Sequence, residues 1–157
     1  MRAAAARLVD APPFELPQHI FFLVTQLMAR RNRALAAQLK PLGLSVQKWR
    51  VIAVLDHAPG CAMGELAELT SVDRTTLTRT LDQLVAERLV DRRAAAHDRR
   101  TMRLSLTVKG AALLRRALPF VIEQNEQAVR GFSAAEVERL RRDLRRMFDN
   151  IENGEGP

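Results

Sequence analysis

The chain has 157 residues, a net charge of +7 and 47% hydrophobic residues, which suits one small domain with a real core. Aromatic residues make up 4% and tyrosine is absent, so the chain lacks the stacking platforms of single-strand and RNA binders. Its positive charge, nearly all arginine, favours a polyanionic partner.

Several classes of protein are disfavoured by what the sequence lacks. Cys61 is the only cysteine, so we expect a structural thiol, no disulfide and a reducing, cytoplasmic location. No signal peptide and no apolar run of about 18 residues is present, so we expect no membrane contact. No metal-ligand spacing, phosphate loop or nucleophile motif occurs, so we expect no metal, no cofactor and no enzyme activity.

The chain begins with an arm followed by a long helix. Residues 1–16 contain Pro12 and Pro13, which break helices, so we expect a flexible arm. From Pro17 to about residue 40, apolar side chains recur with helical spacing and cover two sides of the helix. One small domain cannot bury both sides, so residues 17–42 are predicted to be a dimerisation helix.

Three shorter helices follow. Ser45 caps the first of them, which ends at Ala-Pro-Gly, residues 58–60. A short helix over residues 64–69 and a tight turn lead to Asp73, the cap of a helix over residues 73–85. Two short helices joined by a tight turn, the second polar on its outer side, are typical of a helix-turn-helix.

The helix over residues 73–85 has one leucine-rich face and one polar face. Four threonines fall within six positions: Thr75, Thr76, Thr78 and Thr80. Threonine is a middling helix former, so this number exceeds what an ordinary solvent-exposed face needs. The polar face is therefore interpreted as one that a DNA groove can approach.

An arginine-rich hairpin comes next, with strands expected at residues 89–93 and 102–106. From Arg92 to Arg103, five arginines stand against one acid, Asp98, which gives a net charge of +4. A polar helix followed by a basic hairpin is what a winged helix-turn-helix uses to grip duplex DNA. Residues 43–107 are therefore assigned to a winged helix-turn-helix DNA-binding domain.

The C-terminal part, residues 108–153, is predicted to form two further helices. Pro119 lies inside the first of them and predicts a kink or break near residues 115–119. Ser133 and Glu136 form a capping box at the start of the second. Its apolar residues follow a coiled-coil-like spacing: Val137, Leu140, Leu144, Met147 and Ile151. A disordered tail is expected at residues 154–157.

The wing carries a motif that resembles the MarR (multiple antibiotic resistance regulator) family. In that family the motif is Asp-x-Arg, five residues, then Leu-Thr, and Asp98, Arg100, Leu106 and Thr107 fit it without a gap. The motif and the helix that precedes it carry the resemblance, which covers about residues 17–150. It implies a mainly α fold with six helices and a small β-hairpin wing, in which the N- and C-terminal helices form the dimerisation region.

The resemblance also implies a function. It favours a sequence-specific transcriptional repressor that binds double-stranded DNA as a homodimer at a near-palindromic operator. The alternative is a non-specific architectural DNA-binding protein, which the threonine-rich helix argues against. Methyltransferases with a helix-turn-helix need a cofactor domain, for which 157 residues leave no room.

The expected DNA contacts divide between the helix and the wing. The resemblance implies that the helix reads bases and phosphates in the major groove, and that Arg99 and Arg100 enter the minor groove while Asp98 holds the wing. The strand arginines are expected to track phosphates. The predicted contact residues are Arg74, Thr75, Thr76, Thr78, Arg79, Arg92, Arg93, Asp98, Arg99, Arg100 and Arg103.

Members of this family typically respond to small anionic aromatic molecules or to thiol oxidation. The resemblance places an effector crevice near Phe22, Gln26, Trp49 and Arg50, although Trp49 reads first as a core residue. The chain departs from the family at Arg88, which occupies a turn position that is commonly glycine and that needs a positive φ.

Overall fold

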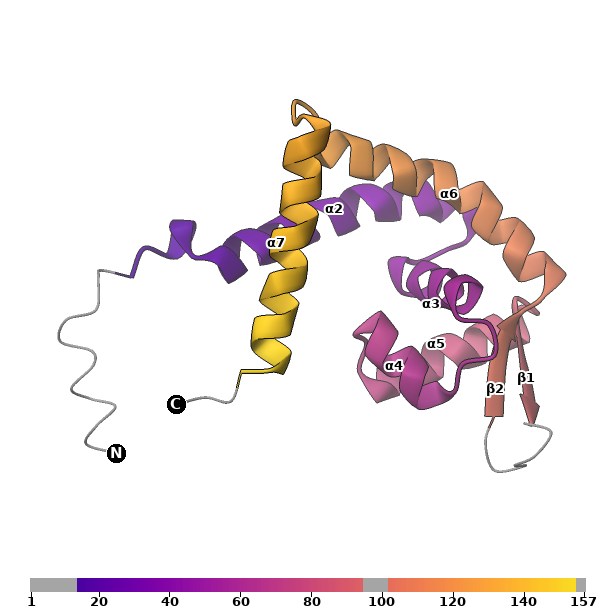
Figure 1. Cartoon of the computed structure of the whole chain (residues 1–157). Helices are drawn as coiled ribbons and strands as arrows, with labels where there is room; N and C mark the ends of the chain where they lie inside the picture. The colour runs from indigo at the N-terminus through magenta and orange to yellow at the C-terminus, as the bar shows by residue number, and fades with distance from the viewer. Residues whose placement is uncertain (1–13, 95–101, 155–157) are drawn as a thin grey trace. The chain divides into compact units, whose positions relative to one another are not determined.

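The computed structural model describes residues 14–94 and 102–154 (Figure 1). Most of the predicted N-terminal arm and C-terminal tail lies outside these residues. The elements, in chain order, are η1 (Leu16–Gln18), α2 (Ile20–Leu39), η2 (Lys40–Leu42), α3 (Val46–His57), α4 (Met63–Thr70), α5 (Arg74–Ala86), β1 (Val90–Ala94), β2 (Met102–Leu106), α6 (Val108–Ala128) and α7 (Ala134–Glu152). Within the described residues these are six α-helices and one antiparallel hairpin, which confirms the predicted fold class.

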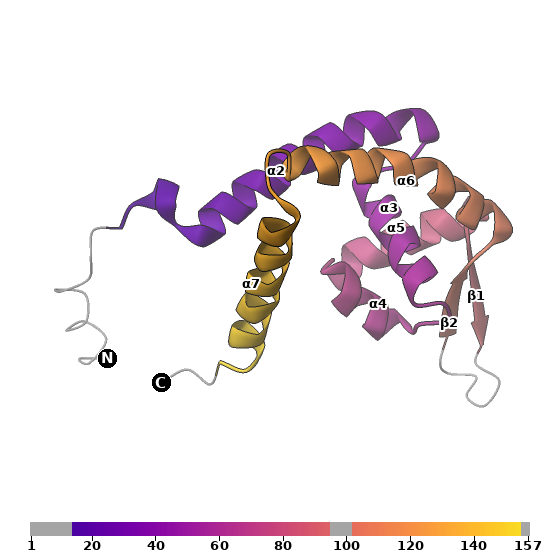
Figure 2. The ribbon, with the colours of Figure 1, turned by 45° about the horizontal axis from the view of Figure 1, so that its top comes forward.

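The chain divides into two compact units, residues 1–120 and 121–157. In the first unit α3, α4 and α5 pack together, and the hairpin lies beside α5 and α3 (Figures 1 and 2). The large side chains that are fully buried come from each α-helix and strand of this unit from α2 to β2: Leu35, Leu39, Val51, Ile52, Leu55, Leu66, Leu77, Leu81, Leu84, Val90 and Leu104. Each contributes about 1.5–3 kcal/mol by leaving water, so this unit has its own core.

The hairpin is antiparallel and pairs Val90 with Leu106 and Ala94 with Met102. It also gains a third partner, which the sequence did not indicate. The Gly60 N–H donates to the Leu104 carbonyl at 2.8 Å, and the Leu104 N–H donates to the Cys61 carbonyl at 3.1 Å. The loop before α4 is therefore hydrogen-bonded to β2, and the hairpin is fixed to the start of the helix-turn-helix.

The turn from α5 into β1 has a left-handed backbone conformation at Arg88, which is unfavourable for a residue other than glycine. Arg88 has φ = +59°, as predicted for this glycine-like position. The Leu89 N–H donates to the Leu84 carbonyl at 2.8 Å, which closes the end of α5. The Thr107 hydroxyl donates to the Arg88 carbonyl at 2.8 Å and Lys109 Nζ donates to the Glu87 carbonyl at 2.8 Å, so the chain entering α6 secures this turn.

Gly110 allows α6 to start directly against the same turn. A Cβ atom at this position would lie 2.1 Å from the Leu89 carbonyl oxygen, a distance that no side chain can occupy. Because the obstacle is backbone, a rotamer change cannot relieve it. The glycine is therefore required for close packing of α6 on the end of α5.

Two predictions about the helices that follow have different outcomes. Of the kink or break predicted near residues 115–119, the break does not occur, because α6 is a continuous helix from Val108 to Ala128. Proline removes one backbone donor, but Arg115, whose carbonyl would accept it, is exposed and solvent can replace that bond. The capping box is confirmed, since the Ser133 N–H donates to Glu136 Oε2 at 2.8 Å.

Exposed apolar side chains remain on α2 and on α7. On α2 they are Ile20, Phe21, Leu23, Val24 and Leu27, and on α7 they are Leu140, Leu144, Phe148 and Ile151. No residue of α7 is buried within the described chain. These helices are therefore amphipathic, and each carries exposed apolar side chains in the described part of the chain.

Arg88→Gly is expected to raise the free energy of unfolding by about 0.5–1 kcal/mol. Relief of the left-handed conformation outweighs the extra freedom that glycine gains in the unfolded chain. Urea denaturation measures the difference. Arg88→Ala removes the same charge but keeps a Cβ, so it should give no such gain, and equal stability of the two variants would contradict the backbone explanation.

Candidate nucleic-acid interface

The start of α5 is fixed by Asp73. Its Oδ1 accepts from the Thr76 N–H at 2.9 Å, which confirms the predicted helix cap. This backbone hydrogen bond, helped by the Thr76 hydroxyl, holds the pKa of Asp73 below its usual value. The cap is thus ionised near neutral pH and sets the point at which the polar face of α5 begins.

The packing of α5 separates its residues into a buried and an outward face. Leu77, Leu81 and Leu84 are buried in the core. Arg74, Thr75, Thr78 and Arg79 are exposed and Thr76 is half-buried, so the predicted contact residues of α5 share one accessible region.

The threonines of α5 have different roles. Thr80 is 7% exposed and its hydroxyl donates to the Thr76 carbonyl, so it serves the core and not the outer face. The exposed Thr78 hydroxyl donates to the Arg74 carbonyl at 2.8 Å. Because its hydrogen is used, Thr78 offers a partner a methyl group and oxygen lone pairs. The threonine count that suggested a DNA-facing helix was therefore partly a feature of the core.

The arginines differ in their availability. In the part of the chain that the structure covers, Arg74 and Arg79 form no ion pair. On β1, the Arg93 side chain is 82% exposed and lies 3.3 Å from Asp91. These three guanidinium groups are open to a polyanion.

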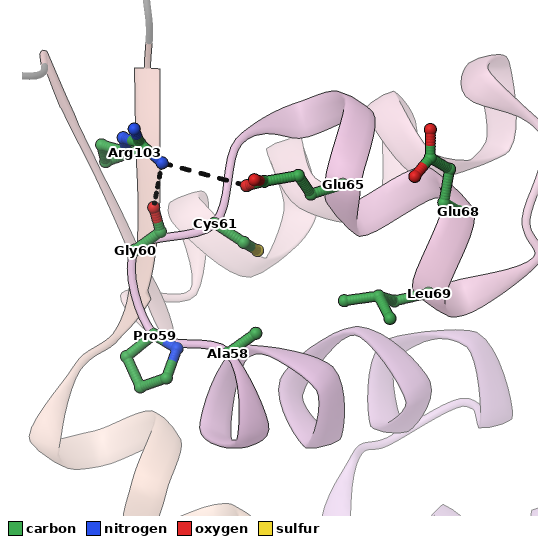
Figure 3. Close-up of a pocket in the computed structure, with 8 residues that line it drawn as sticks. All are labelled: Ala58, Pro59, Gly60, Cys61, Glu65, Glu68, Leu69 and Arg103. Atoms are coloured by element: carbon green, nitrogen blue, oxygen red, sulfur yellow. Dashed lines mark hydrogen bonds and ion pairs between the residues drawn. The ribbon is translucent and has the colours of Figure 1, made fainter.

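The other two strand arginines have firm protein partners. Arg92 Nη2 lies 2.8 Å from Asp82 Oδ1 on α5. Arg103 Nη1 donates to the Gly60 carbonyl at 3.1 Å and lies 3.9 Å from Glu65 Oε2 (Figure 3). Sequence reasoning grouped both with Arg93 as phosphate-tracking residues and gave no partner for Asp82. Asp98, Arg99 and Arg100, predicted at the wing tip, lie outside the described residues.

Next to Arg103 is a shallow hollow of about 450 Å³ between the end of α3, α4 and β2 (Figure 3). Cys61 lies in its wall but is only 6% exposed. Burial, and then the nearby Glu65, raises the pKa of the Cys61 thiol, which disfavours the reactive thiolate. This environment agrees with the structural role expected for Cys61.

Two residues of the predicted effector crevice, Trp49 and Arg50, lie near Arg31 of α2. The Arg31 guanidinium lies 5.4 Å from the centre of the Trp49 ring, and Trp49 Nε1 has no hydrogen-bond partner among the residues described. Burial, and then neighbouring Arg50, lowers the pKa of Arg31. Gln26, by contrast, accepts a hydrogen bond from Arg30. Sequence reasoning missed Arg31, because helical spacing alone does not tell which turn of α2 meets Trp49.

Two further classes of site are not found in residues 14–94 and 102–154. No group of three or more His, Cys, Asp or Glu side chains in these ranges is placed to hold a metal ion. None of the helices there is long and apolar enough to cross a membrane.

Comparisons with known proteins agree with this architecture. A sequence model described as MarR family matches residues 42–101. The HTH-type transcriptional repressor NicR of Pseudomonas putida is 29% identical over 146 residues, which is 92% of this chain and 92% of that protein.

Solved structures extend the match beyond the winged helix. A MarR-family transcriptional regulator from Silicibacter pomeroyi is 30% identical with a TM-score of 0.80, covering 90% of this chain and 96% of that one. A cysteine-to-serine mutant of MarR from E. coli, complexed with operator DNA, is 26% identical with a TM-score of 0.75, covering 87% and 99%. From this likeness over nearly the whole chain, and from the polar helix and basic hairpin described above, the protein belongs to the MarR family of DNA-binding transcriptional regulators.

Proposed function

We propose that the protein represses transcription as a homodimer that binds a near-palindromic operator and releases it when a small anionic aromatic effector binds. The observation that carries the proposal is the exposed face of α5, where Arg74 and Arg79 have no acidic partner in the described chain. Arginine can contact guanine with two hydrogen bonds, and hydroxyls can bind bases or phosphates. In this proposal α5 enters the major groove.

The wing completes the contact with each half of the operator. Arg93 approaches a phosphate, and Arg99 and Arg100 enter the minor groove with Asp98 holding the loop, as the family motif implies. A narrow minor groove attracts arginine through its negative potential. The similarity to NicR, which is named a repressor, supports repression over activation.

A second copy of the chain covers the exposed apolar faces of α2 and α7. In this arrangement residues 17–42 and 108–153 form the dimerisation region and residues 43–107 the DNA-binding domain. Exposed leucine, isoleucine and phenylalanine side chains on amphipathic helices favour association, because their burial removes apolar surface from water. Two copies of α5 would then enter successive major grooves about 34–36 Å apart.

The effector is proposed to bind beside Trp49. Arg31 and Arg50 bring two positive charges together there, and neither forms an ion pair in the described chain. An effector carboxylate would relieve their repulsion, and the buried indole N–H of Trp49 has no hydrogen-bond partner among the described residues. Binding would release DNA if the crevice accepts the effector better in a conformation unsuited to the operator.

Selection of duplexes from a random pool by the full-length protein is expected to yield an inverted repeat, protected as one discrete footprint. Arg79→Ala and Arg100→Ala should each weaken binding to the selected duplex by about tenfold or more, since one specific base contact contributes about 1–3 kcal/mol. Arg142→Ala removes an exposed arginine of α7 that lies outside the proposed DNA contact, and it serves as the control. Uniform coverage without a consensus would instead support an architectural DNA-binding protein.

Leu27→Glu is expected to shift the protein from dimer to monomer, because it introduces a charge into the proposed interface. Leu27 on α2 is 58% exposed in the single chain, and Leu69 on α4 is 54% exposed but lies outside the proposed interface. Leu69→Glu is therefore a closely matched control and should stay dimeric in light-scattering chromatography. A wild-type protein that is monomeric at micromolar concentration would contradict the dimer.

A panel of aromatic carboxylates, beginning with salicylate and benzoate, is expected to contain compounds that raise the melting temperature and release the selected duplex. Arg31→Met and Arg50→Met should abolish both effects. Arg33→Met removes an exposed arginine from α2, the helix of Arg31, and should leave the melting-temperature shift and the release of DNA unchanged. Equal responses to benzoate and to neutral benzamide would contradict recognition of the carboxylate.

A further inference from the structure

The interface between α5 and the hairpin contains an ion pair with an unusual position for a DNA-binding surface. Asp82 lies on the exposed side of α5, where a carboxylate repels phosphate, and its side chain is 59% exposed. The pair that it forms with Arg92, at 2.8 Å, joins the recognition helix to β1. The acid thus holds an arginine that a phosphate could otherwise bind.

A cavity of about 190 Å³ lies next to this pair. Met63, Thr78, Arg92, Met102 and Leu104 line it, so it lies between α4, α5 and the hairpin. Because Arg92 is one of the lining residues, the ion pair joins α5 to β1 beside this cavity.

The opposite strand is secured in a comparable way. Arg103 on β2 donates to the Gly60 carbonyl and approaches Glu65 at the start of α4 (Figure 3). The hairpin is therefore held on one strand to α5 and on the other to the loop before α4. Both contacts involve stem arginines, whereas the neighbouring Arg93 is 82% exposed.

We propose that Asp82 and Arg92 are a positioning pair that sets the wing relative to α5, and that Arg92 acts on DNA through this pair without binding a phosphate. The inference rests on the proposed DNA-binding function and deepens it. Under this proposal, Arg93 and not Arg92 is the arginine of β1 that contacts a phosphate. It also explains why an acidic side chain stands on the face that meets a polyanion.

A double-mutant cycle on the full-length protein tests the pair. Asp82→Ala is expected to weaken binding to the selected duplex by about twofold to thirtyfold, the range for one exposed ion pair in each of two protomers. Arg92→Ala should weaken it similarly, and should add nothing in the Asp82→Ala background. A direct phosphate contact predicts the opposite sign, because removing Asp82 would free Arg92 and strengthen binding.

Asp91 and Arg93 on the same strand provide the matched control. Asp91→Ala should leave binding unchanged or strengthen it, because it frees the exposed Arg93. Arg93→Ala should lower the salt dependence of binding by about 0.9 for each phosphate that is no longer neutralised, whereas Arg92→Ala should leave that slope unchanged. A reduced slope for Arg92→Ala would overturn the proposal.

The conservative variant Arg92→Lys, together with thermal unfolding, distinguishes a positioning role of the pair from a role in fold stability. Arg92→Lys keeps the charge, so it should bind better than Arg92→Ala when Asp82 is present and no better when Asp82 is alanine. Affinity is measured per active protein, with thermal unfolding in parallel. Variants that unfold earlier but bind DNA with unchanged affinity would show a stabilising role only and would refute positioning.

The wild-type protein tests the proposed function separately. The Asp82/Arg92 double-mutant cycle is repeated on a duplex of mixed sequence, where each variant can again be scored as binding more weakly or more tightly. If the wild type binds both duplexes equally, the sequence-specific function fails while the cycle still decides between positioning and phosphate contact.

Discussion

Burial of the leucine face of α5 is the constraint on which the interface depends. Leu77, Leu81 and Leu84 are completely enclosed, and a helix that buries these positions must turn Thr75 and Arg79 outward. The Asp73 cap fixes where that helix begins. The polar face is therefore a geometric consequence of core packing, and no separate feature is needed to present it.

Local rules in the sequence were enough for the elements and several of their ends. The capping residues Asp73 and Ser133 act as expected, and the left-handed conformation of Arg88 follows from its place after the helix. These features depend on residues only a few positions apart. The continuous helix through Pro119 is the exception, because proline in a helix weakens one bond without dictating a break when solvent reaches the freed carbonyl.

The details of the candidate site could not be predicted in the same way. The partners of Arg92 and Arg103 are separated from them by 10 and 43 residues, and Arg31 meets Trp49 across two helices. Net charge identified the basic stretch, but charge counting cannot tell an arginine that faces solvent from one that is held by a carboxylate or a carbonyl. Thr80 shows the same limit. It was counted with the threonines of a DNA-facing surface, but it is buried and belongs to the core.

The close approach of Gly110 to the Leu89 carbonyl has a mechanical consequence. Gly110 places no side chain between the start of α6 and the Leu89 carbonyl, and the Thr107 and Lys109 side chains are bonded to the same turn. We therefore expect a rotation of the first turn of α6 to move the end of α5, the helix that carries Arg79.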